Sequence, residues 1–127
     1  MSGLGPRILV VDDERDSEWV YKLMLEQEGY NVDSYFDPIQ ALTEFKPNYY
    51  DLILLDYRMG GLNGLALIKE IRKLDPLARA ILITAWQPQT LEKDLQNSFM
   101  KVLPKPVSEE KLLEEVRVAM KQNRTDK

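Results

Sequence analysis

Three aspartates stand directly after apolar runs of the sequence, where their carboxylates can act together. Asp12 and Asp13 follow the run at residues 7–11, and Asp56 ends the run at 51–56. Such short apolar runs are typical of strands buried in a parallel sheet, and the acids converge at one edge if the two strands are neighbours. Carboxylates this close raise one another's pKa unless a cation neutralises them. Because oxygen ligands favour a hard cation, we expect Mg²⁺, or Mn²⁺ in its place.

Two further polar side chains end apolar runs in the second half of the chain. Thr84 closes the run at residues 80–84, and Lys105 follows the short run at 102–103. A carboxylate can attack a phosphoryl donor when a metal ion and a cationic side chain neutralise the phosphoryl oxygens. Asp56 is the predicted nucleophile, because the glycine-rich loop after it leaves space for a phosphate. Taken singly, each acidic element is better explained as a helix N-cap.

The segments that position these residues alternate between strand and helix. Strands are predicted at residues 7–11, 31–36, 51–56, 80–84 and 102–103, and the more polar second strand suits a sheet edge. Helices are predicted at residues 15–28, after Asp37-Pro38, after Gly64, at 89–99 with the weakest pattern, and after Ser108. This alternation predicts an α/β fold, a three-layer α/β/α sandwich with a five-stranded parallel sheet and five helices.

Apolar residues at helical spacing indicate these helices. They are Val20, Leu23 and Met24 in the first, Ala41, Leu42 and Phe45 in the second, Leu67, Ile71 and Leu74 in the third, and Leu112, Val116 and Ala119 in the last. Gly29 is expected to end the first helix in the left-handed conformation.

The chain has 127 residues, a net charge of −4, and neither Cys nor His. This length suits one domain, placed at residues 1–120, followed by a polar tail or linker at 121–127. The missing residue types exclude disulfides, thiolate or histidine metal sites, and phosphorylation on histidine within this chain. No dense basic run favours nucleic acid, and no apolar run reaches the ~20 residues of a membrane span. We therefore expect a soluble, cytoplasmic protein.

With these residues in this order and spacing, the chain resembles the receiver domain of two-component response regulators over essentially its whole length. The matches are Asp12 and Asp13 to the family's acidic pair, Asp56 to its phosphoacceptor, Thr84 to its switch hydroxyl, and Lys105, before Pro106, to its lysine followed by a cis-prone proline. The resemblance implies the flavodoxin-like strand order 2-1-3-4-5, which puts the first and third strands side by side.

The resemblance also implies roles. Asp13, Asp56 and the backbone carbonyl of Arg58 would bind Mg²⁺ directly, with Asp12 acting mainly through water. Lys105 would pair with the phosphoryl oxygens, and Thr84 would hydrogen-bond the phosphate and shift a two-state equilibrium. The donor would be a sensor histidine kinase, a phosphotransfer protein or an acyl phosphate, and the readout a downstream effector domain or protein. Such a domain promotes its own phosphorylation and slow aspartyl-phosphate hydrolysis but is not a conventional enzyme; homodimer formation stays open.

Some positions depart from the family's usual pattern. Val102 replaces an aromatic residue, and substitution in the core of a short strand is our preferred explanation. Gly60 stands where the family often has proline, which predicts a looser loop. Arg58 and Trp86 occupy the two positions that flank the acyl phosphate in relatives, so we expect a long-lived phosphoryl group. Trp86 is also the aromatic residue nearest to Thr84 in the sequence, and we expect it to replace in part the aromatic ring that Val102 lacks. The segment 87–101 lacks the small residues that commonly precede the fifth strand, and its first residues predict a late start of the fourth helix.

Other functions on this fold have less support. A flavin-binding protein would need a phosphate loop rich in Ser, Thr and Gly, whereas this chain has Asp12-Asp13-Glu14 there. An aspartyl phosphatase would typically show a second acid two residues after the nucleophile, where this chain has Arg58. One alternative stays open, a receiver-like interaction module that signals without phosphorylation. Val102 supports this alternative, and the intact acidic set opposes it.

Overall fold

Five parallel strands form one sheet in the order β2-β1-β3-β4-β5. The computed structural model describes residues 5–85 and 92–122. The strands are β1 (Arg7–Val11), β2 (Asn31–Tyr35), β3 (Leu52–Leu55), β4 (Ala80–Thr84) and β5 (Lys101–Pro104). The predicted strand order, with the polar second strand at an edge, is confirmed.

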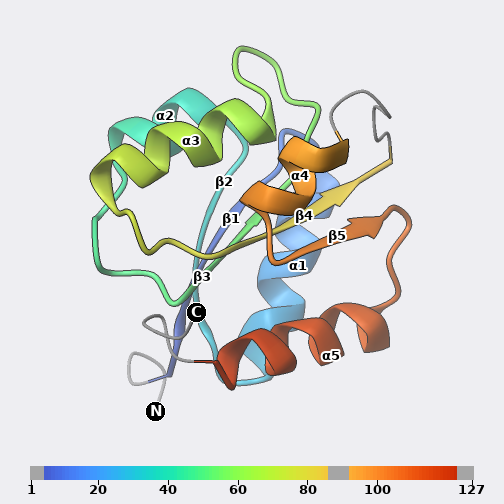
Figure 1. Ribbon diagram of the computed structural model, residues 1–127. Helices are drawn as coiled ribbons and strands as arrows, with labels where there is room; N and C mark the ends of the chain where they lie inside the picture. The colour runs from blue at the N-terminus through green and yellow to red at the C-terminus, as the bar shows by residue number, and fades with distance from the viewer. Residues whose placement is uncertain (1–4, 86–91, 123–127) are drawn as a thin grey trace.

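Helices cover both faces of this sheet and make a three-layer sandwich (Figure 1). They are α1 (Arg15–Gln27), α2 (Pro38–Thr43), α3 (Gly64–Leu74), α4 (Glu92–Ser98) and α5 (Glu109–Met120). Figure 1 shows α1 and α5 on one face and α2, α3 and α4 on the other. No helix in the described part of the chain combines the length and apolar character that a membrane span needs.

Side chains at the helix starts set where several helices begin. The Asp37 carboxylate accepts hydrogen bonds from Ile39 N and Gln40 N, and Pro38 follows it in the first turn. Ser108 Oγ accepts from Lys111 N in the same way. These contacts satisfy backbone N–H groups that have no partner within a helix. At the other end of α1, Gly29 adopts the expected left-handed conformation with a φ of 94°.

The sheet separates two apolar cores. All residues of β3 and β4 are buried, as expected of central strands that helices cover on both sides. On the face of α2, α3 and α4, the core includes Leu67, Ile68 and Ile71. On the face of α1 and α5, it includes Leu25 and Val116. Because helices pack on both faces of these strands, the backbone at the carboxyl ends of the strands is held in a fixed position.

The buried sides of two helices differ from the spacing that predicted them. On α1, Val20 and Leu23 are exposed, whereas Tyr21 and Leu25 are buried. On α3, Leu74 is exposed at the last turn. The apolar residues of the first helix, at 19–21 and 23–25, spread over a wide arc of its surface, so its composition fits more than one rotation. The fourth helix begins at Glu92, while Trp86 and the segment 87–91 lie outside the described residues.

Candidate functional site

Two acids follow neighbouring strands that are held in register. Val11 of β1 pairs with Leu55 of β3, so Asp12 and Asp56 come next at the carboxyl ends of both strands. Asp56 N donates to Val11 O at 3.1 Å, which extends the hydrogen-bond ladder by one residue. The backbone at both acids is therefore fixed by the sheet, and the expected convergence of the two strand ends is observed.

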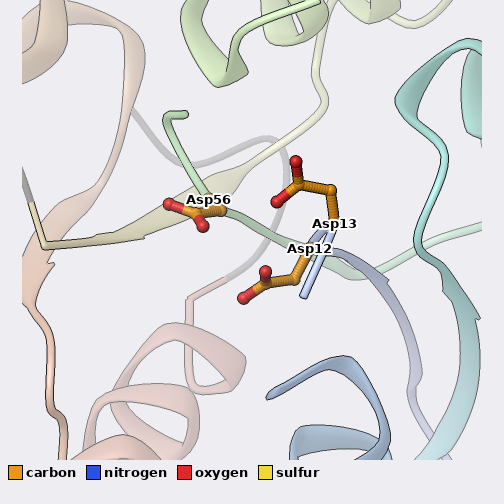
Figure 2. A group of neighbouring side chains, drawn as sticks. All are labelled: Asp12, Asp13 and Asp56. Carbon is orange, nitrogen blue, oxygen red and sulfur yellow. The ribbon is translucent and has the colours of Figure 1, made fainter. Parts of the chain in front are cut away.

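Three carboxylates meet at this edge of the sheet. One carboxylate oxygen each from Asp12, Asp13 and Asp56 lies within 4.8 Å of the other two, and Figure 2 shows the three side chains as neighbours. Asp12 and Asp56 are buried, whereas Asp13 is exposed. The set contains only oxygen donors, which are the ligands that a hard divalent cation prefers. The residues present therefore fit Mg²⁺.

Lys105, which follows the edge strand β5, supplies a fixed positive charge to the acids. Its Nζ donates to Asp12 Oδ2 at 2.9 Å and to Asp56 Oδ2 at 3.1 Å. The side chain is only 13% exposed. Its backbone is set by Lys105 N donating to Thr84 O at 3.0 Å, and its peptide bond to Pro106 is cis, in line with the resemblance to the family. Lys105 thus holds Asp12 and Asp56 together.

Burial and charge shift two pKa values in the cluster. Burial raises the pKa of Asp12 to about 6, although hydrogen bonds from Glu14 N and Lys105 oppose the shift. Burial also lowers the pKa of Lys105, but hydrogen bonds and the charge of its carboxylate partners outweigh that effect and hold it above its ordinary value. Lys105 therefore keeps its charge at neutral pH, and Asp12 takes up a proton more readily than an ordinary aspartate does. A cationic ligand would favour the ionised form of Asp12.

A pocket of about 460 Å³ opens beside the acids on the side of Asp13. Its lining comes from the loop after Asp56 and includes Arg58, Met59, Gly60 and Asn63. Asn63 Oδ1 accepts a hydrogen bond from Ala66 N and so fixes the start of α3 at the end of this loop. The glycine-rich loop after Asp56 therefore borders an open pocket, and Asp13 is the acid of the cluster that lines it. Arg58 is exposed at its rim.

Two further residues that the sequence singled out lie on β4 and β5. Thr84 is buried as the last residue of β4, and Val102 is partly buried against the core on the side of α2, α3 and α4. This packing agrees with the interpretation of Val102 as a core substitution. Trp86, which was expected to report on the site, lies outside the described residues.

Glu14 is a site residue that the sequence did not single out. It is the N-cap residue of α1, yet its side chain makes no capping hydrogen bond. Lys105 Nζ donates instead to Glu14 Oε1 at 3.0 Å. The position of Glu14 directly after the acidic pair was the available signal, but only the fold shows that Lys105 is within its reach.

Comparisons with known proteins agree with this fold and site. A family model described as the response regulator receiver domain matches residues 8–117. The chain belongs to this family, so the fold and family that the sequence indicated are confirmed. The transcriptional regulatory protein ZraR of Salmonella typhimurium is 31% identical over 118 residues, which cover 92% of this chain and 27% of ZraR. This chain therefore spans about a quarter of the length of that relative.

Two solved structures illustrate the likeness. The non-phosphorylated receiver domain of HemR from Leptospira biflexa is 27% identical, with a TM-score of 0.87 over 96% of this chain and 99% of that one. The response regulator TrrA from Thermotoga maritima, solved in complex with Mg²⁺-BeF, is 35% identical, with a TM-score of 0.76 over 90% of this chain and 98% of that one.

Proposed function

We propose that this receiver domain accepts a phosphoryl group on Asp56 in a reaction that needs Mg²⁺, for which Mn²⁺ can substitute. The observation that carries the proposal is the position of the Asp56 carboxylate, 3.1 Å from Lys105 Nζ and within 4.8 Å of oxygens from Asp12 and Asp13. A nucleophilic carboxylate, a fixed cation and a set of metal ligands are the groups that phosphoryl transfer requires. The relative TrrA, solved with Mg²⁺-BeF, supports the same cation here.

Each residue has a proposed part in the transfer. Asp13, Asp56 and the backbone carbonyl of Arg58 would hold Mg²⁺, and Asp12 would act through water. Bound there, Mg²⁺ supplies positive charge to the phosphoryl oxygens. An oxygen of Asp56 attacks phosphorus, and the bond from phosphorus to its donor breaks, so that the donor leaves with the bonding electrons. Lys105, already beside Asp56, then pairs with the transferred group.

We propose that the donor is a phosphohistidine on a sensor histidine kinase or a phosphotransfer protein, and that a small acyl phosphate can replace it. The buried Thr84 lies at the same edge of the sheet and hydrogen-bonds the phosphoryl group, which shifts the domain between two states. An effector domain or protein reads that shift. Water removes the phosphoryl group slowly, and Arg58 at the pocket rim shields it.

Acetyl phosphate tests this function without a partner protein. After incubation with Mg²⁺, intact-mass spectrometry should show the addition of one phosphoryl group, and omission of Mg²⁺ or the substitution Asp56→Asn should abolish it. Asp51→Asn is a matched control, because Asp51 lies at the opposite end of β3 and accepts its hydrogen bond from Arg7 N. A chain that gains no mass under any of these conditions would instead fit an interaction module that signals without phosphorylation.

A further inference from the structure

A backbone N–H from the loop after Asp56 reaches back to the acidic pair. Gly60 N donates to Asp13 Oδ2 at 3.1 Å, although 47 positions separate the two residues in the sequence. Both residues line the pocket beside the acids. This hydrogen bond joins the loop after β3 directly to the end of β1.

Burial and a contact with Lys105 hold the other two acids in place, whereas Asp13 is exposed. The carboxylate of Asp12 accepts from Glu14 N and from Lys105, and Asp56 is both buried and bound by Lys105. Asp13 is exposed, and within residues 5–85 and 92–122 the Gly60 N–H is the one hydrogen-bond donor to its side chain. An exposed aspartate without such a donor exchanges between rotamers and loses more entropy when a cation orders it.

In this chain the hydrogen bond to Asp13 needs an N–H group at position 60 rather than a glycine as such. A Cβ placed on Gly60 would meet no atom within 4 Å, and its φ lies outside the left-handed region. Its neighbour Gly61, by contrast, has a φ of 89°. Alanine therefore fits at position 60 and keeps the hydrogen bond to Asp13, whereas proline has no N–H to donate.

We propose that the Gly60 N–H is a positioning group for the metal site, and that it holds Asp13 ready to bind a divalent cation. The inference deepens the proposed function and rests on it. One oxygen of Asp13 accepts from Gly60 N, and the lone pairs of the carboxylate that remain are available to the cation. Groups that orient a metal ligand in this way typically change metal affinity by about 10- to 100-fold when they are removed.

Mg²⁺ titration of wild type, Gly60→Pro and Gly60→Ala tests the proposal. The NMR signals of backbone amides near Asp56 report Mg²⁺ binding in each titration. Because Asp13 is exposed, we expect Gly60→Pro to weaken Mg²⁺ binding by about tenfold, the lower end of that range. Gly60→Ala, which keeps the N–H, should retain the wild-type affinity within about twofold. Equal affinities of the proline and alanine variants would overturn the proposal.

A double-mutant cycle separates this role from a general disturbance of the loop. In an Asp13→Ala background, Gly60→Pro should cause no further loss of Mg²⁺ affinity, because the group it acts through is gone. A further tenfold loss there would mean that proline merely distorts the loop, and the proposal would be wrong.

A measurement that does not need the proline variant keeps the proposal testable if that variant fails to fold. The Gly60 amide proton should exchange faster with solvent in Asp13→Ala than in wild type, and an unchanged exchange rate would contradict the hydrogen bond. If wild type itself binds no Mg²⁺, the proposed function fails together with this inference. If wild type binds Mg²⁺ and accepts phosphate while the proline and alanine variants match it, only the inference fails.

Discussion

Lys105 Nζ lies 3.1 Å from Asp56 Oδ2, although the two residues are 49 positions apart and follow strands that are not neighbours. The strand between them is β4, whose last residue accepts a hydrogen bond from Lys105 N. The lysine thus reaches across β4 to the acids. Its charge is shared among Asp12, Glu14 and Asp56, so any cation or phosphoryl group that joins the cluster must change this arrangement.

Removal of Lys105 should destabilise the metal-free protein. Lys105→Met leaves Asp12 and Asp56 buried close together without their cation, which we expect to cost about 2 kcal/mol of unfolding free energy. Mg²⁺ should then stabilise this variant more than it stabilises wild type, since it neutralises the same acids. Urea denaturation with and without Mg²⁺ measures both effects.

Lys73→Met is a control for this prediction, because the Lys73–Glu70 pair is exposed and such pairs contribute little to stability. If Lys105→Met and Lys73→Met have the same stability in the absence of metal, the cluster does not depend on the lysine charge.

Asp12 should make the stability of the metal-free protein depend on pH. Its pKa is about 6 in the folded state against an ordinary value of 3.8, so the folded state binds this proton more tightly than the unfolded state. The contribution of Asp12 to the free energy of unfolding therefore falls as pH rises from about 4 to about 6, by an amount on the order of 2 kcal/mol. Asp12→Asn lacks this titration.

The stability of Asp12→Asn relative to wild type should accordingly rise across the same pH interval, as denaturation at pH 4, 5, 6 and 7 would measure. A difference that is constant with pH would contradict the raised pKa. A difference that falls as pH rises would mean that the pKa of Asp12 is lowered instead.

Gly64 should be far less tolerant of substitution than Gly60. A Cβ on Gly64 would lie 2.3 Å from the backbone oxygen of Asp56 and 3.0 Å from Leu82 Cδ1, whereas one on Gly60 would meet nothing within 4 Å. Gly64→Ala must push the start of α3 away from β3, which we expect to cost about 3 kcal/mol. Gly60→Ala should leave the melting temperature nearly unchanged. Similar melting temperatures for the two variants would show that α3 does not pack closely on Asp56.

Arg79 should stabilise the end of α5. Its guanidinium donates to Ala119 O and Gln122 O at 2.8 Å and to Asp51 O at 2.9 Å, and so joins the last turn of α5 to the start of β3. Arg79→Met should destabilise the protein by about 2 kcal/mol and increase hydrogen exchange in the last turn of α5.

The exposed Arg117 offers a control on the same helix, because its ion pair with Glu28 is long, at 3.7 Å, and exposed to solvent. Arg117→Met should change neither stability nor exchange appreciably. Unchanged exchange at the end of α5 in Arg79→Met would contradict the role of Arg79.

The strands and the acids that follow them could be predicted because each depends on local pattern, whereas the strand order was implied by the resemblance to receiver domains. An apolar run that ends in an acid specifies both a buried strand and the chemistry at its carboxyl end. The rotation of α1 could not be predicted, because Val20 and Leu23 are as apolar as the buried Tyr21 and Leu25. Only packing against the sheet decides which of these residues face the core.

Two contacts of the site could not be predicted from the sequence, because both join segments that are distant along the chain. Lys105 Nζ donates to Glu14, and Gly60 N donates to Asp13. No local sequence pattern indicates either hydrogen bond. The departure at Gly60 could be read as a looser loop, and its hydrogen bond to Asp13 becomes visible only when the loop after β3 is placed beside the end of β1.

The most direct test of the central claim identifies the residue that becomes phosphorylated. Borohydride reduces an aspartyl phosphate to homoserine, so the chain should be treated with acetyl phosphate and Mg²⁺, reduced, digested and sequenced by mass spectrometry. We predict homoserine at position 56 and at no other aspartate, and none when Mg²⁺ is omitted. Homoserine at Asp12 or Asp13, or its absence from position 56 in a sample that has gained a phosphoryl group, would contradict the account.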